Sequence, residues 1–387
     1  MTEGRPFIVW CAGVHWDALR GTDRHLVAAL SERADILWVD PPLSIVRKVR
    51  PSPHGQQNEG FGVTEVAAGV TRLTVVVPPF SSRPVMREAA SGLTRIAIRW
   101  AVNRSRIRRA RPVSAMVITA PDPLFGAIPD ATRVYFATDD FTAGAELLGL
   151  PAVRLQRLER KLARQADLLV GVSDALVDRY RDLAKANLVL PNGCLMPRDA
   201  APVAPSSLGL TLPGPLATVV GQFSHRIDIE LLEAVADSGA SLLLVGPHDP
   251  TYEPCRFKAL IQRANVEWVD QQPYEMVASY LRASRVGLTP YVGSDFNRSS
   301  FPLKTLEYLA AGRAVVSTPL PAVGALGTDQ ISVAATPGAF ASAVTERLAE
   351  RLTDELVERR RSLAALHSWQ ARANLFLAAL EHVAAAE

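Results

Sequence analysis

One short segment combines an amine and a carboxylate at the start of an expected helix. A loop of small polar residues, 293–300, leads into the run SFPLKTLEYLAAG, with Pro302 in the first helical turn. The free N–H groups of a helix N-terminus suit a diphosphate, and Lys304 adds a point charge one turn further on. Glu307 lies on an adjoining part of the same helix face, where it can accept hydrogen bonds from a ribose diol. The alternative is a solvated lysine–glutamate pair on an ordinary helix.

A second set of polar residues follows the expected strands of the N-terminal half. Ligands of open parallel sheets bind beyond the carboxyl ends of the strands, where carboxylates can activate a hydroxyl or stabilise positive charge. The candidate catalytic residues are Asp17, Asp139 and Asp140. The candidate ligand-binding residues are His15, Trp16 and Asp122, and Gly13 would let the backbone approach a phosphate group. Aspartates after strands also commonly cap helices, which is the ordinary alternative.

The elements that must position these residues alternate between short apolar runs and amphipathic helical stretches, a pattern typical of parallel strands with crossover helices. In the first half, the expected strands are 7–11, 35–39, 115–119, 133–136, 168–172 and 188–190. Runs 61–66 and 70–77 predict a hairpin around Ala68-Gly69. Two helices are expected, one capped by Thr22 or Asp23 and one over 153–165, with an apolar stripe at Val153, Leu155, Leu158 and Leu162.

The pattern then starts again after a change in composition. Residues 191–215 hold six prolines and three glycines, which predicts an exposed interdomain linker. Beyond it, strands are expected over 216–220, 242–245, 266–269, 286–289 and 314–317, and helices over 229–236, 273–283 and 301–311, with an almost wholly helical segment from 337. The sequence therefore predicts an α/β protein with two Rossmann-like domains facing across a cleft.

The predicted domains are an N-terminal Rossmann-like domain over 1–195, a Pro-rich linker over 196–215 that permits hinge motion, and a C-terminal Rossmann-like domain over 216–368. A C-terminal helix over 369–387 is expected to return to the first domain.

Composition excludes several classes of protein. The chain has 387 residues, 48% hydrophobic and 21% charged, which fits a globular protein rather than a disordered or fibrous one. No apolar run approaches the roughly 20 residues of a membrane span, and the first residues lack a signal-peptide pattern. Three distant cysteines, Cys11, Cys194 and Cys255, form no paired framework or metal clip. We therefore expect a soluble cytoplasmic protein.

Here the sequence resembles a known family. The segment FPLKTLEYLAAGRAVVST looks like the donor-site signature of the retaining glycosyltransferases with the GT-B fold, and it is most similar to the family-four and teichuronic-acid-type enzymes. LLLVGP at 242–247, the run from Asn265 to Tyr291 and LVLPNG at 188–193 support the resemblance in order and spacing. The resemblance implies a nucleotide-sugar donor held mainly by the C-terminal domain, no bound metal and no cofactor. It also implies a hydroxyl acceptor held mainly by the N-terminal domain, where His15, Trp16 and Asp122 are the candidate acceptor-binding residues. By the same carry-over, the donor-binding residues are Gly13, Arg226, Gly246, Ser300, Phe301, Pro302, Leu303, Lys304 and Glu307.

Two departures from the family pattern stand out. Many members carry two glutamates separated by seven residues; the second matches Glu307, but Ser299 stands where the first would fall. Asp295 is a nearby candidate to replace the missing carboxylate. Gln222 occupies the place of a usual arginine, which leaves Arg226 as the cationic diphosphate ligand. The alternative for Arg226 is a capping or salt-bridge role beside Asp228.

Basic residues gather between Arg87 and Arg111, where eight arginines accompany one acid, Glu88. At 100° per residue, one helix face carries Arg95, Arg99, Arg106 and Arg109, and the opposite face carries Leu93, Ile96, Trp100 and Ile107. In one interpretation the apolar side packs on the sheet and the arginines are solvated. In the other, the arginines dock the protein on anionic lipid at the inner face of the membrane, near a lipid-linked acceptor. Nucleic acid is a poor fit, because no aromatic platform or known motif accompanies the basic stretch.

The predicted function is a glycosyltransferase of polysaccharide, lipid-linked glycan or natural-product biosynthesis. Two rivals remain open: a nucleotide-sugar epimerase on the same fold, and a catalytically degenerate partner subunit that binds a nucleotide. A dehydrogenase is disfavoured because no GxGxxG follows any strand.

Overall fold

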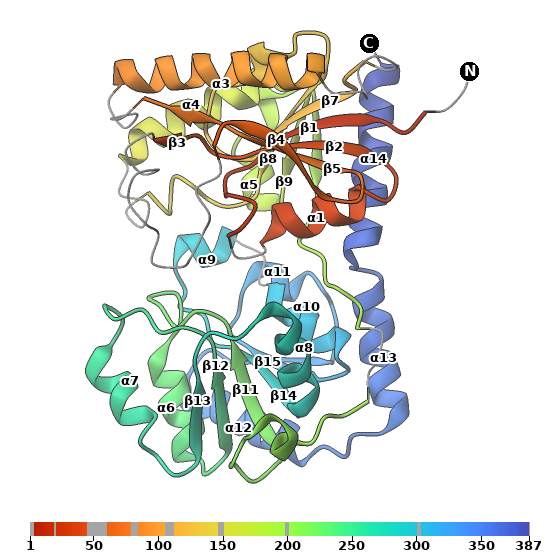
Figure 1. The fold of residues 1–387 in the computed structure, drawn as a ribbon. Helices are drawn as coiled ribbons and strands as arrows, with labels where there is room; N and C mark the ends of the chain where they lie inside the picture. Colours follow the sequence, from red (N-terminus) through yellow and green to blue (C-terminus); the bar gives the residue numbers. More distant parts are fainter. Residues whose placement is uncertain are drawn as a thin grey trace. The chain divides into compact units, whose positions relative to one another are not determined.

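The computed structural model describes residues 4–18, 21–44, 60–78, 84–104, 112–145, 151–197, 201–299 and 303–386. The chain divides into two compact units, one made of Met1–Pro191 with Arg372–Glu387 and the other of Asn192–Ala371. Each unit has its own open sheet (Figure 1). Among the described helices, none has both the length and the apolar composition needed to cross a membrane.

The first unit is built on an eight-stranded sheet with the order β10-β9-β8-β7-β1-β2-β5-β4. Its strands are β1 (Phe7–Cys11), β2 (Asp35–Val39), β4 (Gly62–Ala67), β5 (Val70–Thr74), β7 (Ala115–Ile118), β8 (Thr132–Ala137), β9 (Leu168–Gly171) and β10 (Ala186–Val189). Among the described strands of this sheet, only β4 and β5 pair antiparallel, which confirms the predicted hairpin. Gly69 takes the positive φ of 72° that its turn requires. A separate two-stranded sheet joins β3 (Leu43–Ser44) to β6 (Val76–Val77).

Helices of the first unit are α1 (Thr22–Leu30), α3 (Pro84–Arg104), α4 (Ala152–Gln165) and α5 (Asp174–Asp178), with short 3₁₀ turns η1 (Phe125–Ala127) and η2 (Arg181–Leu183). The last helix, α14 (Trp369–Ala385), joins this unit from Arg372 onward. Phe376 of α14 packs on Trp10 of β1, with ring centroids 5.9 Å apart. The end of the chain thus completes the core beside the central strand.

The second unit has a six-stranded, all-parallel sheet with the order β13-β12-β11-β14-β15-β16. Its strands are β11 (Leu216–Val220), β12 (Ser241–Val245), β13 (Val266–Val269), β14 (Val286–Thr289), β15 (Ala314–Ser317) and β16 (Ile331–Val333). Its helices are α6 (Ile229–Asp237), α7 (Pro254–Leu260), α8 (Tyr274–Ala283), α9 (Asp295–Ser299), α10 (Leu303–Ala310), α11 (Pro321–Gly324), α12 (Pro337–Ala349) and α13 (Asp354–Ala365), with the 3₁₀ turn η3 (Pro205–Leu208). Successive β12 residues alternate between two core clusters, one under α8 and α10 and one under α6 and α12 (Figure 1).

The predicted linker is not simply exposed. Leu210 and Leu212 are each only 7% exposed and belong to the core cluster of the second unit. The carboxylate of Glu267 accepts hydrogen bonds from the backbone N–H groups of Thr211 and Leu212, at 2.9 and 3.2 Å. The prolines of this segment predict an exposed linker, but its two leucines pack against the apolar core of the second unit. The described part of the predicted hinge is therefore anchored to one unit.

Two predicted helix faces are wrong in detail. In α3, Leu93 and Ile96 are exposed, by 42% and 61%, instead of packing on the sheet. The helix instead buries a different face of mostly small residues: Ala90, Ser91, Thr94, Ala97, Ile98, Ala101 and Val102. In α4, Val153 is 60% exposed, because it lies about 200° around the helix from the buried Leu155. Small side chains let a helix approach a sheet closely, a choice that apolarity alone does not predict.

Candidate functional site

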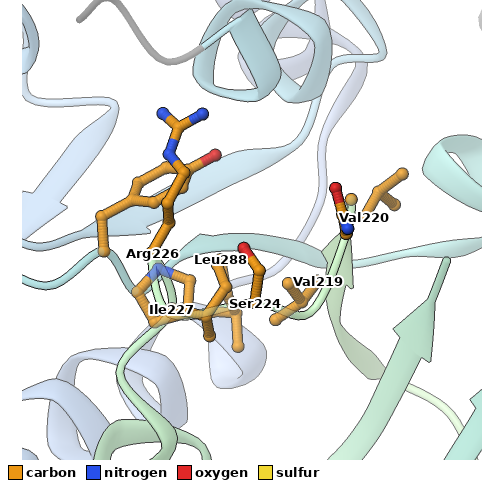
Figure 2. Close-up of a pocket in the computed structure, with 10 residues that line it drawn as sticks. Val219, Val220, Ser224, Arg226, Ile227 and Leu288 are labelled. Carbon is orange, nitrogen blue, oxygen red and sulfur yellow. The ribbon is translucent and has the colours of Figure 1, made fainter. Parts of the chain in front are cut away.

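A cavity of about 110 Å³ lies at the carboxyl end of the second sheet, where β11 and β14 end. Its walls come from the last residues of β11, from Leu288 of β14, and from the loop after β11 that carries Gln222, Ser224 and Arg226. Figure 2 shows Ser224 and Arg226 on that loop, with Leu288 and Val220 from the strands around them. This is the edge at which open parallel sheets bind ligands.

Two glycines bring neighbouring strand-end loops together beside this cavity. Gly221 follows β11 and donates its N–H to the carbonyl of Val245, at 2.9 Å. Gly246 follows β12 with φ at 134°, and a Cβ at that position would lie 2.0 Å from the carbonyl oxygen of Gly221. A side chain at 246 would therefore push the two loops apart. The predicted donor-binding Gly246 shapes the backbone next to the cavity.

Arg226 is held in place by three neighbours that follow β14. Its Nε donates to Oδ1 of the buried Asn297, at 2.9 Å, and its guanidinium carbon lies 4.6 Å from the ring centroid of Phe296 and 5.5 Å from that of Tyr291. Asn297 in turn donates from Nδ2 to the carbonyls of Arg226 and Val292. Sequence reasoning missed all three neighbours of Arg226, since they become partners only through the fold.

The alternative pairing of Arg226 with Asp228 is not what the structure shows. The Asp228 carboxylate caps α6 by accepting the N–H of Glu230, at 3.0 Å. Within the described part of the chain, no carboxylate forms an ion pair with Arg226. The guanidinium is therefore fixed in direction while its charge stays available to an anion.

Lys304 and Glu307 lie on the first turns of α10 and bond to each other. Lys304 Nζ is 2.5 Å from Glu307 Oε2, and the side chains are 23% and 11% exposed. The pair is thus largely enclosed, not the solvated surface pair of the ordinary alternative. Tyr291 lines the cavity, and burial raises its pKa. Leu303, the remaining described residue of the predicted signature, begins α10.

Part of the predicted donor site lies outside the described residues, namely Ser300, Phe301 and Pro302. Ser299 ends α9, and the exposed Asp295 of that helix is bonded to Arg298. Gln222, which takes the place of the usual arginine, is exposed and lines the cavity. Among the described residues, no group of three or more His, Cys, Asp and Glu side chains could hold a metal ion.

In the first unit, Asp40 gathers the polar residues that follow β1. Its Oδ1 accepts the N–H of Trp16 at 2.9 Å, and its Oδ2 accepts from Arg72 Nε at 2.6 Å and lies 3.8 Å from His15 Nδ1. Arg72 also pairs with the predicted catalytic Asp17, at 2.9 Å. Burial opposes ionisation of Asp40, but the nearby His15 and the hydrogen bonds from Arg72 and Trp16 hold its pKa below the usual range. Asp40 was overlooked because its Asp-Pro-Pro context indicated only a turn.

The aspartates after β7 and β8 differ in what they can reach. Asp140 is fully buried. Its carboxylate accepts hydrogen bonds from both terminal nitrogens of Arg179 and, at 2.8 Å, from the backbone N–H of Ala143. Through these hydrogen bonds Asp140 anchors the segment that follows β8. Asp122 accepts from Ser91 Oγ at 2.7 Å and lines a cavity of about 70 Å³ together with Gly13. Asp139 is half-buried and its charge acts on the pKa of Asp23.

Asp23 is a buried carboxylate directly beneath the Gly13 loop. The helix is capped at Gly21 without a side-chain bond, so Asp23 is not the cap that the sequence predicts. Its Oδ2 accepts from Thr119 Oγ1 at 2.7 Å and from the N–H of Gly13 at 3.4 Å. Burial raises the pKa of Asp23 from 3.8 to about 6. Gly13 donates to Thr119 Oγ1 as well, at 3.0 Å, so the loop and the carboxylate form one small network.

This raised pKa predicts a measurable pH effect on stability. Because native Asp23 holds its proton up to about pH 6 whereas the unfolded chain loses it near pH 4, the free energy of unfolding falls as pH rises between these values. The Asp23→Asn variant lacks this loss. We therefore expect its stability relative to wild type to rise by up to about 3 kcal/mol between pH 3.5 and pH 7, measured by urea unfolding. Asp237→Asn, on the surface, is the control; a difference independent of pH contradicts the assignment.

Comparison with known proteins gives a family match within the second unit. Residues 217–350 match the family model described as glycosyl transferases group 1. The putative teichuronic acid biosynthesis glycosyltransferase TuaH of Bacillus subtilis (strain 168) is 28% identical over 155 residues, which cover 39% of this chain and 39% of TuaH. The match thus spans about two fifths of the length of that relative.

Solved structures match almost the whole chain. Sucrose-phosphate synthase from Thermosynechococcus elongatus has a TM-score of 0.72 at 18% identity, covering 99% of this chain and 100% of that one. A structure described as trehalose-6-phosphate from E. coli bound with UDP-2-fluoro glucose has a TM-score of 0.67 at 12% identity, covering 97% and 98%. At these identities the likeness shows the fold, and it confirms the predicted GT-B architecture of two Rossmann-like domains.

Proposed function

We propose that this chain, whose residues 217–350 are a glycosyl transferase group 1 domain, moves a sugar from a nucleotide-sugar to a hydroxyl acceptor. The observation that carries the proposal is Arg226, held in place at the cavity at the carboxyl end of the second sheet, together with the largely enclosed Lys304–Glu307 pair at the start of α10. Two cations and one carboxylate match the two parts of a nucleoside diphosphate, the phosphates and the ribose diol. Each of the three lies inside the segment that matches the family.

In this proposal the departing diphosphate sets the main electrostatic task. As the bond between the sugar and the diphosphate breaks, negative charge grows on the phosphate oxygens, and cations held in advance stabilise it. Arg226 is fixed by Asn297 and Phe296, so it loses little conformational entropy when it binds the phosphates. Lys304 exchanges its ion pair with Glu307 for one with the phosphates. Glu307 then accepts hydrogen bonds from the ribose hydroxyls. Retention of anomeric configuration and independence from metal follow from the family resemblance and belong to the proposal.

We assign acceptor binding to the first unit. His15, Trp16 and Asp17 lie together there around Asp40 and Arg72. Asp17 is 52% exposed at its side chain, which leaves its carboxylate accessible to a hydroxyl. Polysaccharide biosynthesis inside the cell is the setting we propose, because the TuaH relative is described as a teichuronic acid biosynthesis enzyme.

Incubation with UDP-, GDP- and dTDP-sugars tests the proposal and separates its rivals. A transferase releases nucleoside diphosphate and does so faster when a hydroxyl acceptor is added. An epimerase changes the sugar of the donor without any acceptor. A partner subunit binds nucleotide but turns over no donor on its own. Mass spectrometry of the products distinguishes the three, and absence of nucleotide binding by calorimetry would reject all of them.

We further propose that α3 contacts an anionic membrane that carries a lipid-linked acceptor. Leu93 and Ile96 project from α3, and the half-exposed Phe61 packs on Trp100 with ring centroids 4.9 Å apart. Arg104 lies over the same Trp100, at 5.4 Å. An apolar ridge beside cations suits an anionic bilayer surface. Of the predicted contact arginines, Arg99 donates to the carbonyls of Gly126 and Ala127, while Arg106 and Arg109 lie outside the described residues.

Vesicle co-sedimentation checks this contact. We expect the triple variant Leu93→Ser, Ile96→Ser, Arg104→Ser to bind phosphatidylglycerol vesicles at least tenfold more weakly than wild type, since one basic contact alone contributes about 1 kcal/mol. Leu366→Ser removes a leucine that is 70% exposed in the second unit and is the matched control. Equal binding of the triple variant and wild type, or no binding by wild type, rejects the contact.

A further inference from the structure

The cavity lies where β11 and β14 stop pairing before either strand ends. Their parallel register runs through Ala217–Val286 and Thr218–Gly287 and goes no further. On its other side, β11 stays paired with β12 as far as Val220. Continuing the β14 register would pair Val219 with Leu288 and direct the Val220 N–H to β14. These unpaired strand ends form the cavity wall.

A tyrosine hydroxyl occupies the point where the pairing stops. The N–H of Val220 donates to Tyr308 Oη at 2.8 Å, and Tyr308 Oη donates to the carbonyl of Thr218 at 2.9 Å. A hydroxyl can donate and accept at once, so one side chain satisfies two backbone groups of β11. Buried backbone groups without a partner are costly, and the hydroxyl removes that cost while the strands remain apart.

The ring of Tyr308 reaches this position only because residue 287 is glycine. Tyr308 is fully buried, and a Cβ on Gly287 would lie 2.0 Å from its Cγ atom. The ring therefore crosses β14 where that strand has no side chain. Tyr308 directly follows Glu307 on α10, and it lies one turn beyond Lys304. The same contact that separates the strands thus fixes the helix that carries both residues.

We propose that Tyr308 is a positioning residue of the nucleotide-binding site: its hydroxyl keeps β11 and β14 apart at the cavity and fixes Lys304 and Glu307 relative to Arg226. This inference rests on the proposed function for its effect on nucleotide binding, and on the fold alone for its effect on the strands. Without the hydroxyl, the Val220 N–H turns to β14 and the cavity narrows.

The test compares Tyr308→Phe with Ser284→Ala. Ser284 is buried, and its hydroxyl bonds to Thr218 Oγ1 at 2.7 Å, so this control removes a buried hydroxyl beside the same strand but away from the cavity. We expect both variants to lose a few degrees in Tm. Only Tyr308→Phe should weaken binding of the nucleoside diphosphate that wild type prefers, by about tenfold or more, in calorimetry well below Tm. Equal weakening in both variants, or none in Tyr308→Phe, overturns the proposed role.

Crystal structures of wild type and Tyr308→Phe provide the second readout, which needs no nucleotide. We expect the variant to bring the Val220 N–H within hydrogen-bond distance of β14, and strands that stay apart overturn the inference. If wild type binds no nucleotide, the proposed function fails while this structural comparison still decides the role of Tyr308. If Tyr308→Phe does not fold, the double variant Gly287→Ala, Tyr308→Leu replaces it, because the added methyl group fills part of the space that the ring leaves.

Discussion

The Glu307→Ala variant is expected to bind nucleoside diphosphates about 100-fold more weakly than wild type, because two hydrogen bonds from a ribose diol to a carboxylate are lost. Glu307 is only 11% exposed, so water does not readily replace the carboxylate when the ribose arrives. The change also removes the 2.5 Å bond between Lys304 and Glu307. In our proposal, however, Lys304 already binds the phosphates when the nucleotide is bound. Isothermal titration with UDP, GDP and dTDP measures the effect.

Two further variants separate the role of Glu307 from a general effect of charge. Glu307→Gln keeps an oxygen that accepts a hydrogen bond but carries no charge, so its loss should be smaller, about tenfold. Asp237→Ala removes a carboxylate from an ion pair with Arg263 on the surface of the same unit, and it should bind as wild type does. Unchanged affinity for all three nucleotides in Glu307→Ala would count against the ribose assignment.

The Arg226→Gln variant should lose about 100- to 1,000-fold in kcat/KM for the donor, the range seen when one preorganised group that stabilises developing charge is removed. The structure gives Arg226 that preorganisation through Asn297 and Phe296. Steady-state release of nucleoside diphosphate, at saturating acceptor, is the measurement. A loss in kcat as well as in binding would indicate that the cation acts on the transition state.

Charge and geometry at Arg226 can be tested separately. Arg226→Lys keeps the positive charge but lacks the planar fork that bonds Asn297 and stacks on Phe296, so we expect an intermediate loss. Asn297→Ala leaves Arg226 intact and loosens it. Arg256→Gln removes an arginine that pairs with Glu233 elsewhere in the same unit and should leave turnover unchanged. If Arg226→Gln also retains full turnover, the diphosphate is neutralised by other groups.

The second unit shows how much of the structure local sequence patterns predict. Its predicted strands appear in the structure within a residue of their expected bounds. Strands buried on both faces appear in the sequence as continuous apolar runs, and a glycine or proline directly after β11, β12 and β14 marks the end of each. Lys304 and Glu307 meet because residues three apart on a helix are neighbours, which needs no tertiary information.

The environments of the other site residues do not follow from local pattern. Arg226 is 71 positions from Asn297, and only the pairing order of β11 with β14 brings them together. Asp40 and Asp23 looked like turn and cap residues, yet both carboxylates point inward to partners on other strands or loops. Their sequence context gave no sign of this, because a buried carboxylate is recognised by what surrounds it.

Helix α3 marks the boundary between the two kinds of information. The sequence alone determined that the segment is helical and that arginines and large apolar residues lie on different faces. Which face is buried was decided by the neighbouring surface, which accepts Ala97 and Ala101 closely and leaves Ile96 in solvent. Periodicity and end signals depend on residues within one or two turns, so the chain by itself specifies its elements and the lysine–glutamate pair. Burial, strand separation and the partners of each charge arise from contacts between distant segments, and only the packed structure assigns them.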